Sequence, residues 1–305
     1  MIYTPFESFQ SFLKKEAPDL PLSPIETAQI IVTGSYQKDD YYESHNVLLV
    51  PFTGTNNIDI VLIKDKGMHL FNSNVHSQYV AERALTLTLT LLGTIMPFHD
   101  GLKKGDWAGR TSSERTAWTS LYNQSVGFLG YGAINQHLRT LMNSFNINAY
   151  TLDRGKRYSD VQGIIGIEEL IEVSKVIVMA LPLTKQTHHL MNANRINAMT
   201  GKYLINVGRG DTIEEKPLFD ALKAGKLAGF ASDVWWQYPK NNTSVSPSNY
   251  PFEELDNVVM TPHNGGFAEG AERARFKDTL HHIRAYLSGN VEDALDVDKI
   301  LKYES

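Results

Sequence analysis

The sequence has no cysteine among its 305 residues. This absence excludes disulfide bonds, thiolate zinc sites, iron–sulfur clusters and cysteine nucleophiles. Any chemistry must therefore come from other side chains. A chain without disulfides also fits a cytoplasmic location, which we expect here.

Long apolar runs and an excess of positive charge are missing as well. The longest uncharged apolar stretch, residues 84–98, is too short to span a bilayer and is interrupted by threonines. Residues 1–15 lack the apolar segment of a signal peptide. With 29 basic and 34 acidic residues the net charge is −5, so we expect neither a nucleic-acid nor an anionic-membrane partner.

The length and the order of apolar segments indicate the fold class. A chain of 305 residues exceeds the usual size of one core, so two domains are expected. Short apolar runs alternate with amphipathic stretches, which predicts an α/β fold with a parallel sheet covered on both faces. Strands are predicted at Gln29–Thr33, Val47–Pro51, Ser125–Leu129, Asn148–Leu152, Val176–Leu181, Tyr203–Val207, Gly229–Ser232 and Val258–Thr261, with helices at Ala133–Ser144, Glu168–Val173 and Glu214–Ala224.

Three further segments divide the chain. Residues Ser77–Met96 fit both a strand period and a helical stripe, and their length favours a buried helix. Residues Asp100–Ser113 are rich in glycine, lysine and serine and predict a boundary region. Residues Tyr238–Pro251, with their prolines, predict a long loop.

A glycine turn follows the predicted strand Ser125–Leu129. Gly130 makes the bend, and Gly132 lets the backbone approach a pyrophosphate at the N-terminus of the next helix. The third position of the pattern holds Asn135 instead of glycine or alanine, so looser packing of helix on strand is expected there. The turn predicts a dinucleotide site lined by Gly130, Tyr131, Gly132, Ala133 and Ile134.

Asp153 closes the next predicted strand and bears on which dinucleotide binds. A carboxylate there suits the 2′-hydroxyl of adenosine and repels a 2′-phosphate, which favours NAD over NADP. An aspartate that only caps a loop is the alternative. The opposite choice, NADP, is favoured by three basic residues that follow: Arg154, Lys156 and Arg157. The alternative is that these residues only form a solvated turn.

With these motifs the chain resembles the D-isomer-specific 2-hydroxyacid dehydrogenases. This family includes D-lactate, glycerate, phosphoglycerate and formate dehydrogenases. The resemblance covers most of the chain and is strongest from Ser125 to Gly266. Five short motifs occur in the family's order: residues 104–107, 126–134, 180–187, 205–210 and 261–266.

The resemblance implies two domains. A Rossmann-type doubly wound sheet, residues 95–269, would bind NAD. A flavodoxin-like substrate domain would be split between residues 1–94 and 270–305. Family members commonly dimerise through the cofactor domain, so a homodimer is expected.

The resemblance also implies site residues. Those expected at the cofactor are Leu181, Pro182 and Thr187 beside the adenine and pyrophosphate, with Val207, Asp233 near the nicotinamide amide, and Gly265. Backbone N–H groups of Gly54, Thr55 and Asn56 would hold the substrate carboxylate, and the segment 72–76, with Asn74, would face the same substrate.

Reduction of a 2-oxo acid requires that the carboxylate is held, the carbonyl is polarised and a proton is supplied. Arg209 suits the first two tasks, because a guanidinium offers forked donors and keeps its charge. His263 suits the third, because histidine is the usual proton donor near neutral pH. A surface ion pair for Arg209 and a structural role for His263 are the alternatives.

One position departs from the family pattern. The family has a glutamate that pairs with the histidine, where this chain reads Tyr238. A phenol can hydrogen-bond an imidazole but carries no charge near pH 7. Gln237 or Glu269 would be substitute partners. Trp235, Trp236 and Tyr238 would either wall an apolar pocket or belong to the core or a dimer contact.

The sequence therefore predicts an NAD-dependent oxidoreductase that interconverts a small 2-hydroxy acid and a 2-oxo acid, with Arg209, His263 and Tyr238 as catalytic residues. Oxidation of a small anion in the manner of formate dehydrogenase is one alternative. A non-catalytic protein that senses NAD is another, which the missing glutamate favours and the presence of Arg209 and His263 disfavours. No His/carboxylate spacing suggests a metal site.

Overall fold

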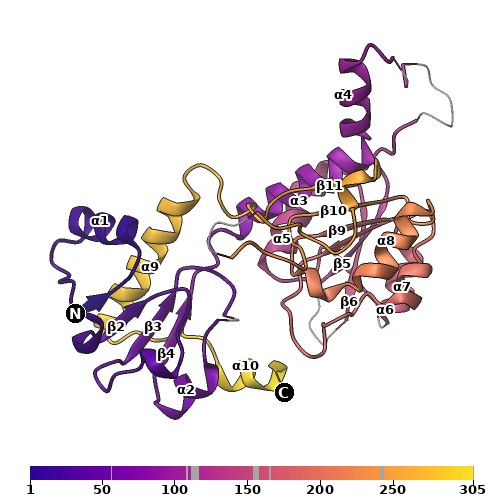
Figure 1. Cartoon of the computed structure of the whole chain (residues 1–305). Coiled ribbons are helices and arrows are strands. Elements are labelled where there is room, and N and C mark those ends of the chain that lie inside the picture. Colours follow the sequence, from indigo (N-terminus) through magenta and orange to yellow (C-terminus); the bar gives the residue numbers. More distant parts are fainter. Residues whose placement is uncertain are drawn as a thin grey trace. The chain divides into compact units, whose positions relative to one another are not determined.

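The computed structural model describes residues 1–55, 57–107, 109–110, 117–153, 158–164, 166–240 and 244–304. The chain forms two compact units (Figure 1). Unit 1 comprises Met1–His76, Thr184–Gln186 and Phe267–Ser305, and unit 2 comprises Ser77–Leu183 and Thr187–Gly266. Among the described residues, no helix is both long and apolar enough to cross a membrane.

Unit 1 is built on a four-stranded parallel sheet. The strands lie in the order β1 (Ile2–Tyr3), β2 (Ile30–Val32), β3 (Val47–Val50) and β4 (His69–Asn72). Leu22 adds an isolated parallel bridge to Ile2 on the free edge of β1. With this bridge counted as a reduced strand, the order by chain position is 2-1-3-4-5, which is flavodoxin-like as predicted.

Successive residues of these strands point to opposite faces, and helices cover both. One face packs on α1 (Glu7–Glu16) and α9 (Ala271–Leu287) through residues that include Phe9, Leu13, Val32, Leu49 and Ile283. The other packs on α2 (Ile60–Asp65) and α10 (Val297–Glu304) through residues that include Ile31, Leu48, Ile63, Ile300 and Leu301.

Unit 2 is built on a seven-stranded sheet whose neighbouring strands all run parallel. The strands are β5 (Ser125–Leu129), β6 (Asn148–Leu152), β7 (Gln162–Ile164), β8 (Val176–Met179), β9 (Tyr203–Asn206), β10 (Gly229–Ser232) and β11 (Val258–Met260). Their order is β11-β10-β9-β8-β5-β6-β7. This is the Rossmann order 3-2-1-4-5-6 with one further strand, so the predicted doubly wound sheet is confirmed.

Helices cover both faces of this sheet. On one face lie α3 (Ser77–Leu92) and α5 (Ala133–Leu141), and on the other α6 (Ile167–Val173), α7 (Ala193–Asn197) and α8 (Glu215–Lys223). Helix α4 (Ile95–Lys103) stands away from the sheet (Figure 1). Short 3-10 turns lie at Ile25–Thr27, Lys38–Asp40, Met142–Phe145, Gly210–Thr212 and Phe252–Glu254.

The predicted helix Ser77–Met96 is too long, because the structure breaks it after Leu92. Thr94 has a φ of 52°, in the left-handed region that a continuous helix excludes. A new helix, α4, begins at Ile95 and occupies the first part of the predicted boundary region Asp100–Ser113.

The boundary between the compact units also differs from the one expected at residue 94. Helix α3 buries Leu87, Leu91 and Leu92 in the core of unit 2, so unit 2 begins at Ser77. Its main part ends at Gly266 instead of residue 269. The assignment of unit 1 as the substrate domain and of unit 2 as the NAD-binding domain is a prediction.

Candidate active site

The predicted site residues of unit 2 follow the carboxyl ends of its strands. Parallel pairing aligns these ends, since Leu129 pairs with Met179, Asn206 with Met179 and Ser232, and Ser232 with Met260. The segments that follow carry Gly130 after β5, Asp153 after β6, Leu181 and Pro182 after β8, Val207 and Arg209 after β9, Asp233 after β10 and His263 after β11. The edge at which open α/β sheets bind ligands therefore holds them all.

The glycine turn has room for a pyrophosphate. Gly130 has a φ of 85°, and a Cβ there would lie 2.8 Å from the Ala180 carbonyl oxygen, so only glycine fits. Gly132 is different: its φ is −89°, and an added Cβ would meet nothing within 4 Å. Gly132 is the N-cap of α5 and no side chain caps this helix end. Open space before uncapped N–H groups fits the pyrophosphate of NAD.

The looser packing expected at Asn135 is not found. Its side chain is fully buried, and Nδ2 donates to the carbonyl oxygens of Gly130 at 2.7 Å and Val178 at 3.4 Å. The amide thus joins the turn after β5 to strand β8. Two backbone acceptors satisfy the donors of this amide, whereas its Oδ1 is buried without a partner among the described residues.

Tyr131, predicted at the cofactor, turns its side chain into the protein. Its hydroxyl donates to Asp160 at 2.5 Å, and its ring packs edge-on against Tyr158 at 4.7 Å between centroids. Because these contacts engage the side chain, only backbone atoms of Tyr131 are available to bind a cofactor. Ala133 and Ile134 form the first turn of α5, where backbone N–H groups lack helical partners.

Asp153 lies exposed directly after β6. Because Thr151 of β6 pairs with Phe128 of β5, Asp153 stands level with Gly130 on the neighbouring strand. In the Rossmann arrangement, a carboxylate at this position can reach the ribose of adenosine. Arg154, Lys156 and Arg157 lie outside the described residues.

The loops after β8 and β9 fix each other. Within the loop after β8, the Thr187 hydroxyl donates to the Pro182 carbonyl at 2.6 Å. Between the two segments, the buried Val207 donates its N–H to the Met179 carbonyl at 2.9 Å. A Cβ on Gly208 would lie 2.5 Å from the Leu181 carbonyl oxygen, and one on Gly210 2.2 Å from the Trp235 carbonyl oxygen. Both glycines beside Arg209 are therefore required by close backbone contacts.

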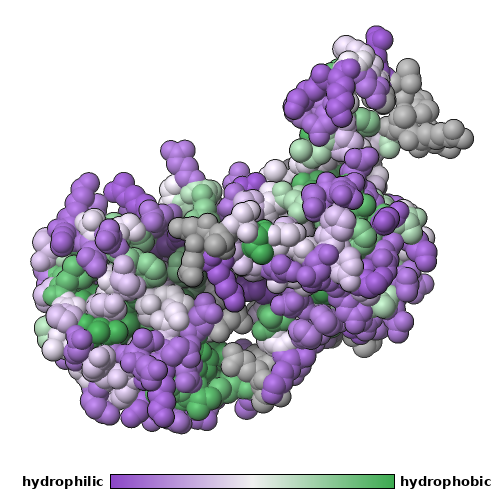
Figure 2. All heavy atoms as spheres, in the orientation of Figure 1, coloured by the Kyte–Doolittle hydropathy of each residue, from purple (hydrophilic) through white to green (hydrophobic). Residues whose placement is uncertain are grey.

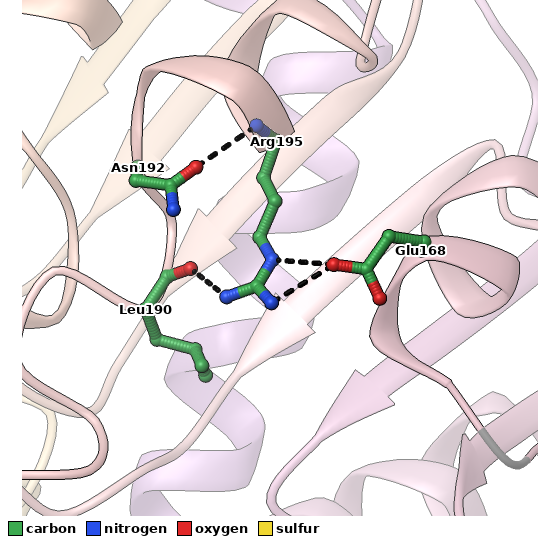
Figure 3. A network of polar contacts seen from close by, with 4 residues as sticks. All are labelled: Glu168, Leu190, Asn192 and Arg195. Atoms are coloured by element: carbon green, nitrogen blue, oxygen red, sulfur yellow. Dashed lines mark hydrogen bonds and ion pairs between the residues drawn. The ribbon is translucent and has the colours of Figure 1, made fainter.

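Arg209 is partly buried, and burial lowers its guanidinium pKa without removing its charge. Nη1 donates to the Gly208 carbonyl at 2.8 Å. Within the part of the chain that the structure describes, Arg209 forms no ion pair with a carboxylate. Arg195 in the same unit shows the opposite arrangement (Figure 3): its guanidinium holds Glu168 at 2.9 Å and the Leu190 carbonyl at 2.7 Å. Arg209 thus keeps donors for an anion.

A carboxylate clamp holds the loop that carries His263. Asp233 is 2% exposed, and one of its oxygens accepts from the Thr261 hydroxyl at 2.6 Å and from the Asn264 N–H at 3.1 Å. The other oxygen accepts from the Gly265 N–H at 2.8 Å. The loop needs this support because His263 has a φ of 57°. Sequence reasoning missed the clamp, although an aspartate ending a strand beside a polar Thr-Pro loop was its signal.

The surroundings of His263 lower its pKa. Burial is the larger cause, the positive charge of Arg209 adds to it, and Asp233 opposes both. The charge of Arg209 also acts on Tyr238, so Arg209, Tyr238 and His263 form one electrostatic group.

Tyr238 lies beside His263, with 5.5 Å between the ring centroids. Its hydroxyl accepts from the Trp235 N–H at 3.1 Å, and burial raises the pKa of the phenol, so it is neutral near pH 7. Gln237 does not replace the missing glutamate, since its side chain donates to Asn249 at 2.7 Å. Glu269 belongs to unit 1.

The two tryptophans belong to the core of unit 2. Trp235 is 5% exposed and donates from its indole to the Thr261 carbonyl at 2.8 Å. Trp236 donates to the Ile213 carbonyl at 3.0 Å and stacks on Phe252. The structure therefore favours the core among the alternatives open for these residues.

The predicted substrate residues of unit 1 follow β3 and β4. Asn72 donates from Nδ2 to the Thr53 carbonyl at 2.8 Å, which joins the loop of Gly54 and Thr55 to the segment 72–76. Asn74 is exposed in that segment. Asn56 lies outside the described residues.

Comparison with known proteins identifies the family. Residues 85–265, more than half of the chain, match the family model "D-isomer specific 2-hydroxyacid dehydrogenase, NAD binding domain". A D-3-phosphoglycerate dehydrogenase of Methanocaldococcus jannaschii is 29% identical over 284 residues, 89% of this chain and 52% of that protein. A glyoxylate reductase of Pyrococcus horikoshii is 27% identical over 259 residues, 82% of this chain and 75% of that protein. The chain thus spans about half the length of the first relative and three quarters of the second.

Solved structures agree on the fold. The PH0520 protein from Pyrococcus horikoshii matches with a TM-score of 0.78 at 26% identity, covering 98% of this chain and 96% of that one. A D-lactate dehydrogenase from Aquifex aeolicus matches with a TM-score of 0.81 at 23% identity and 96% coverage of both chains, which shows a shared fold.

The matched NAD-binding domain confirms the predicted cofactor. The protein belongs to the D-isomer-specific 2-hydroxyacid dehydrogenase family, as its motifs predicted.

Proposed function

We propose that this protein reduces a small 2-oxo acid to the D-2-hydroxy acid, with Arg209 and His263 as its catalytic residues. The observation that carries the proposal is a charged, partly buried Arg209 without a carboxylate partner in the described chain, acting electrostatically on His263. Such an arginine binds and polarises an oxo acid, and such a histidine supplies the proton.

The roles follow from what the reaction requires. NADH, when bound, supplies the hydride that adds to the carbonyl carbon. Arg209 donates to the carboxylate and the carbonyl oxygen, and stabilises the charge that grows on that oxygen. Protonated His263 transfers its proton to the same oxygen, so the 2-hydroxy acid leaves and the imidazole is neutral. The neutral ring of Tyr238 lies beside the His263 imidazole and adds no charge to its surroundings.

A screen of small acids tests the proposal. The purified protein is incubated with NADH and glyoxylate, pyruvate or 3-hydroxy-2-oxopropanoate, and the loss of NADH absorbance is followed. Turnover with at least one of these acids is expected. NADH binding without turnover of any oxo acid would favour a sensor of NAD, and reduction of NAD by formate alone would favour the formate-type reaction.

Asp153 is proposed to set the choice of dinucleotide. Its carboxylate would accept from the 2′-hydroxyl of NADH and repel the 2′-phosphate of NADPH. We expect NADH to bind at least about tenfold more tightly, equivalent to roughly 1.4 kcal/mol. Fluorescence titration measures both affinities, and Asp153→Asn should narrow the difference. Equal affinities in the unaltered protein would contradict this role.

Tyr238→Glu is expected to shift the pH dependence of reduction. Reduction requires protonated His263, so kcat/KM falls as pH rises through the lowered pKa of His263. A carboxylate beside the ring favours the imidazolium and should move this limb to higher pH by about one unit. Tyr238→Phe is the control that adds no charge. An unmoved limb in a folded, active Tyr238→Glu variant would show that position 238 does not govern the titration.

Three further assignments are part of the proposal. Unit 2 would be the NAD-binding domain, supported by its glycine turn, and unit 1 the substrate domain with Gly54, Thr55, Asn56 and Asn74. The protein would act in the cytoplasm. A homodimer through unit 2 would cover apolar side chains on and after α4: Ile95, Met96, Leu102, Trp107 and Trp118 are 45–66% exposed. The one face that Figure 2 shows is mainly hydrophilic, with apolar residues scattered among the polar ones.

A further inference from the structure

The long loop predicted at Tyr238–Pro251 has two arms that are bonded to each other. The outgoing arm carries Gln237 and Tyr238, and the return arm is the segment 246–249. The backbone N–H of Gln237 donates to the Pro247 carbonyl at 3.0 Å, which joins the arms. Long loops without regular structure are uncommon inside compact domains and are often functional. What holds this one in place therefore bears on the site beside it.

One carboxylate anchors the return arm. Glu215 is the first residue of helix α8, and its Oε1 accepts from the Ser248 hydroxyl at 2.6 Å and from the Asn249 N–H at 2.7 Å. Its Oε2 accepts from Asn249 Nδ2 at 3.0 Å. Ser248 is 4% exposed, so the arm is drawn into the surface of unit 2 at this point. Hydrogen bonds to a carboxylate are stronger than those between neutral groups, so three of them make a firm anchor.

The anchor continues to the outgoing arm through two amides. A carboxylate only accepts hydrogen bonds, so the amide nitrogen of Asn249 faces Glu215 and its oxygen is left for another donor. That donor is Gln237, whose Nε2 lies 2.7 Å from Asn249 Oδ1. The chain of side-chain bonds thus begins on helix α8 and ends one residue before Tyr238.

Tyr238 connects this chain to the catalytic histidine. Its ring centroid lies 5.5 Å from that of His263, and its hydroxyl accepts from the Trp235 N–H at 3.1 Å. A ring at this distance keeps water from one side of the imidazole, which disfavours the imidazolium. The charged groups that act on His263 are Arg209 and Asp233, and neither belongs to the loop. The loop therefore acts on the histidine through the position of the tyrosine ring.

We propose that Glu215 is a positioning residue of the active site, which holds the Tyr238 ring against His263 through the bonded amides of the loop. The inference rests on the proposed function in that His263 is the proton donor. Without the carboxylate, the return arm loses three bonds and the outgoing arm loses its support. The ring can then leave the imidazole, water reaches the histidine, and its proton is held more tightly.

The test measures the pKa of His263 directly and through catalysis. The imidazole is titrated by NMR in protein with isotope-labelled histidine, with His263→Asn to assign the signal, and kcat/KM for reduction is recorded against pH. In Glu215→Ala we expect the pKa to rise, and the reductive limb to move to higher pH, by at least about half a pH unit, because burial is the larger cause of the lowered pKa. Tyr238→Ala should give the same shift, and the double variant no further one.

A second variant and a control complete the set. Asn249→Ala removes the middle of the chain at an exposed position and should shift the pKa of His263 in the same direction, so it decides the question if Glu215→Ala does not fold. Glu214→Ala is the matched control, because this neighbouring carboxylate accepts from the Ala193 N–H at 2.8 Å instead. It should leave the pKa and the pH limb unchanged.

Three results would overturn the inference. They are an unmoved His263 pKa in folded Glu215→Ala or Asn249→Ala, an equal shift in the control, and shifts of Glu215→Ala and Tyr238→Ala that add up in the double variant. Failure of the proposed function looks different. If the unaltered protein reduces no oxo acid, the proposed function fails, while the NMR titration still decides whether Glu215 governs the histidine.

Discussion

Replacement of Arg209 by lysine is expected to lower kcat/KM for the 2-oxo acid by at least about 10²-fold, equivalent to roughly 2.7 kcal/mol of transition-state stabilisation. Lysine keeps the positive charge but loses the planar fork that donates to two oxygens at once. NADH affinity should change little, because the glycine turn follows a different strand. Steady-state kinetics with NADH and fluorescence titration of NADH measure the two quantities.

Arg195→Lys is the matched control. Arg195 belongs to the same unit, but its guanidinium holds Glu168 and the Leu190 carbonyl (Figure 3). Its replacement should cost at most about 1 kcal/mol of stability, the usual range for an exposed ion pair, and leave kcat/KM unchanged. Unaltered kinetics in Arg209→Lys would place Arg209 outside the site.

Replacement of His263 by asparagine is expected to lower kcat by about 10²–10⁴-fold, the usual contribution of a general acid–base. Asparagine is the appropriate replacement because it tolerates the positive φ that position 263 requires. The remaining activity should lose the pH limb that belongs to His263. NADH should still bind, which fluorescence titration checks.

His189→Asn controls for the backbone. His189 also has a positive φ, 51°, and is exposed like His263, but it lies in the loop after β8. This variant should keep full activity and the same pH profile. A His263→Asn enzyme that retains both kcat and the pH limb would require another proton donor.

The regular parts of the fold could be predicted because their pattern is local. Strands β5, β6 and β10 have the predicted bounds, as they are apolar runs between clear turn signals. Strands β1, β4 and β7 were missed. Strand β1 has only two residues, β4 begins and ends with a polar residue, and β7 begins with glutamine and glycine, so none of them forms a recognisable apolar run.

The site could be predicted only as a set of positions. The motifs place Arg209 and His263 after strands, but the aspartate that ends β10 does not by its position alone show that Asp233 binds three donors of the His263 loop. That arrangement depends on the register of β10 and β11. Asn135 illustrates the same limit, since its burial is acceptable only because the carbonyls of Gly130 and Val178 meet its amide.

The two glycines beside Arg209 have a consequence for how this enzyme can change. Any side chain at position 208 or 210 would collide with the backbone of Leu181 or Trp235, so the segment that carries the arginine has almost no freedom to mutate. In unit 1, by contrast, Thr55 and Asn74 in the loops after β3 and β4 already carry side chains. Under the proposed assignment of the units, new substrate ranges should therefore arise, in evolution or in directed selection, from substitutions in unit 1, while the segment that carries Arg209 is inherited unchanged.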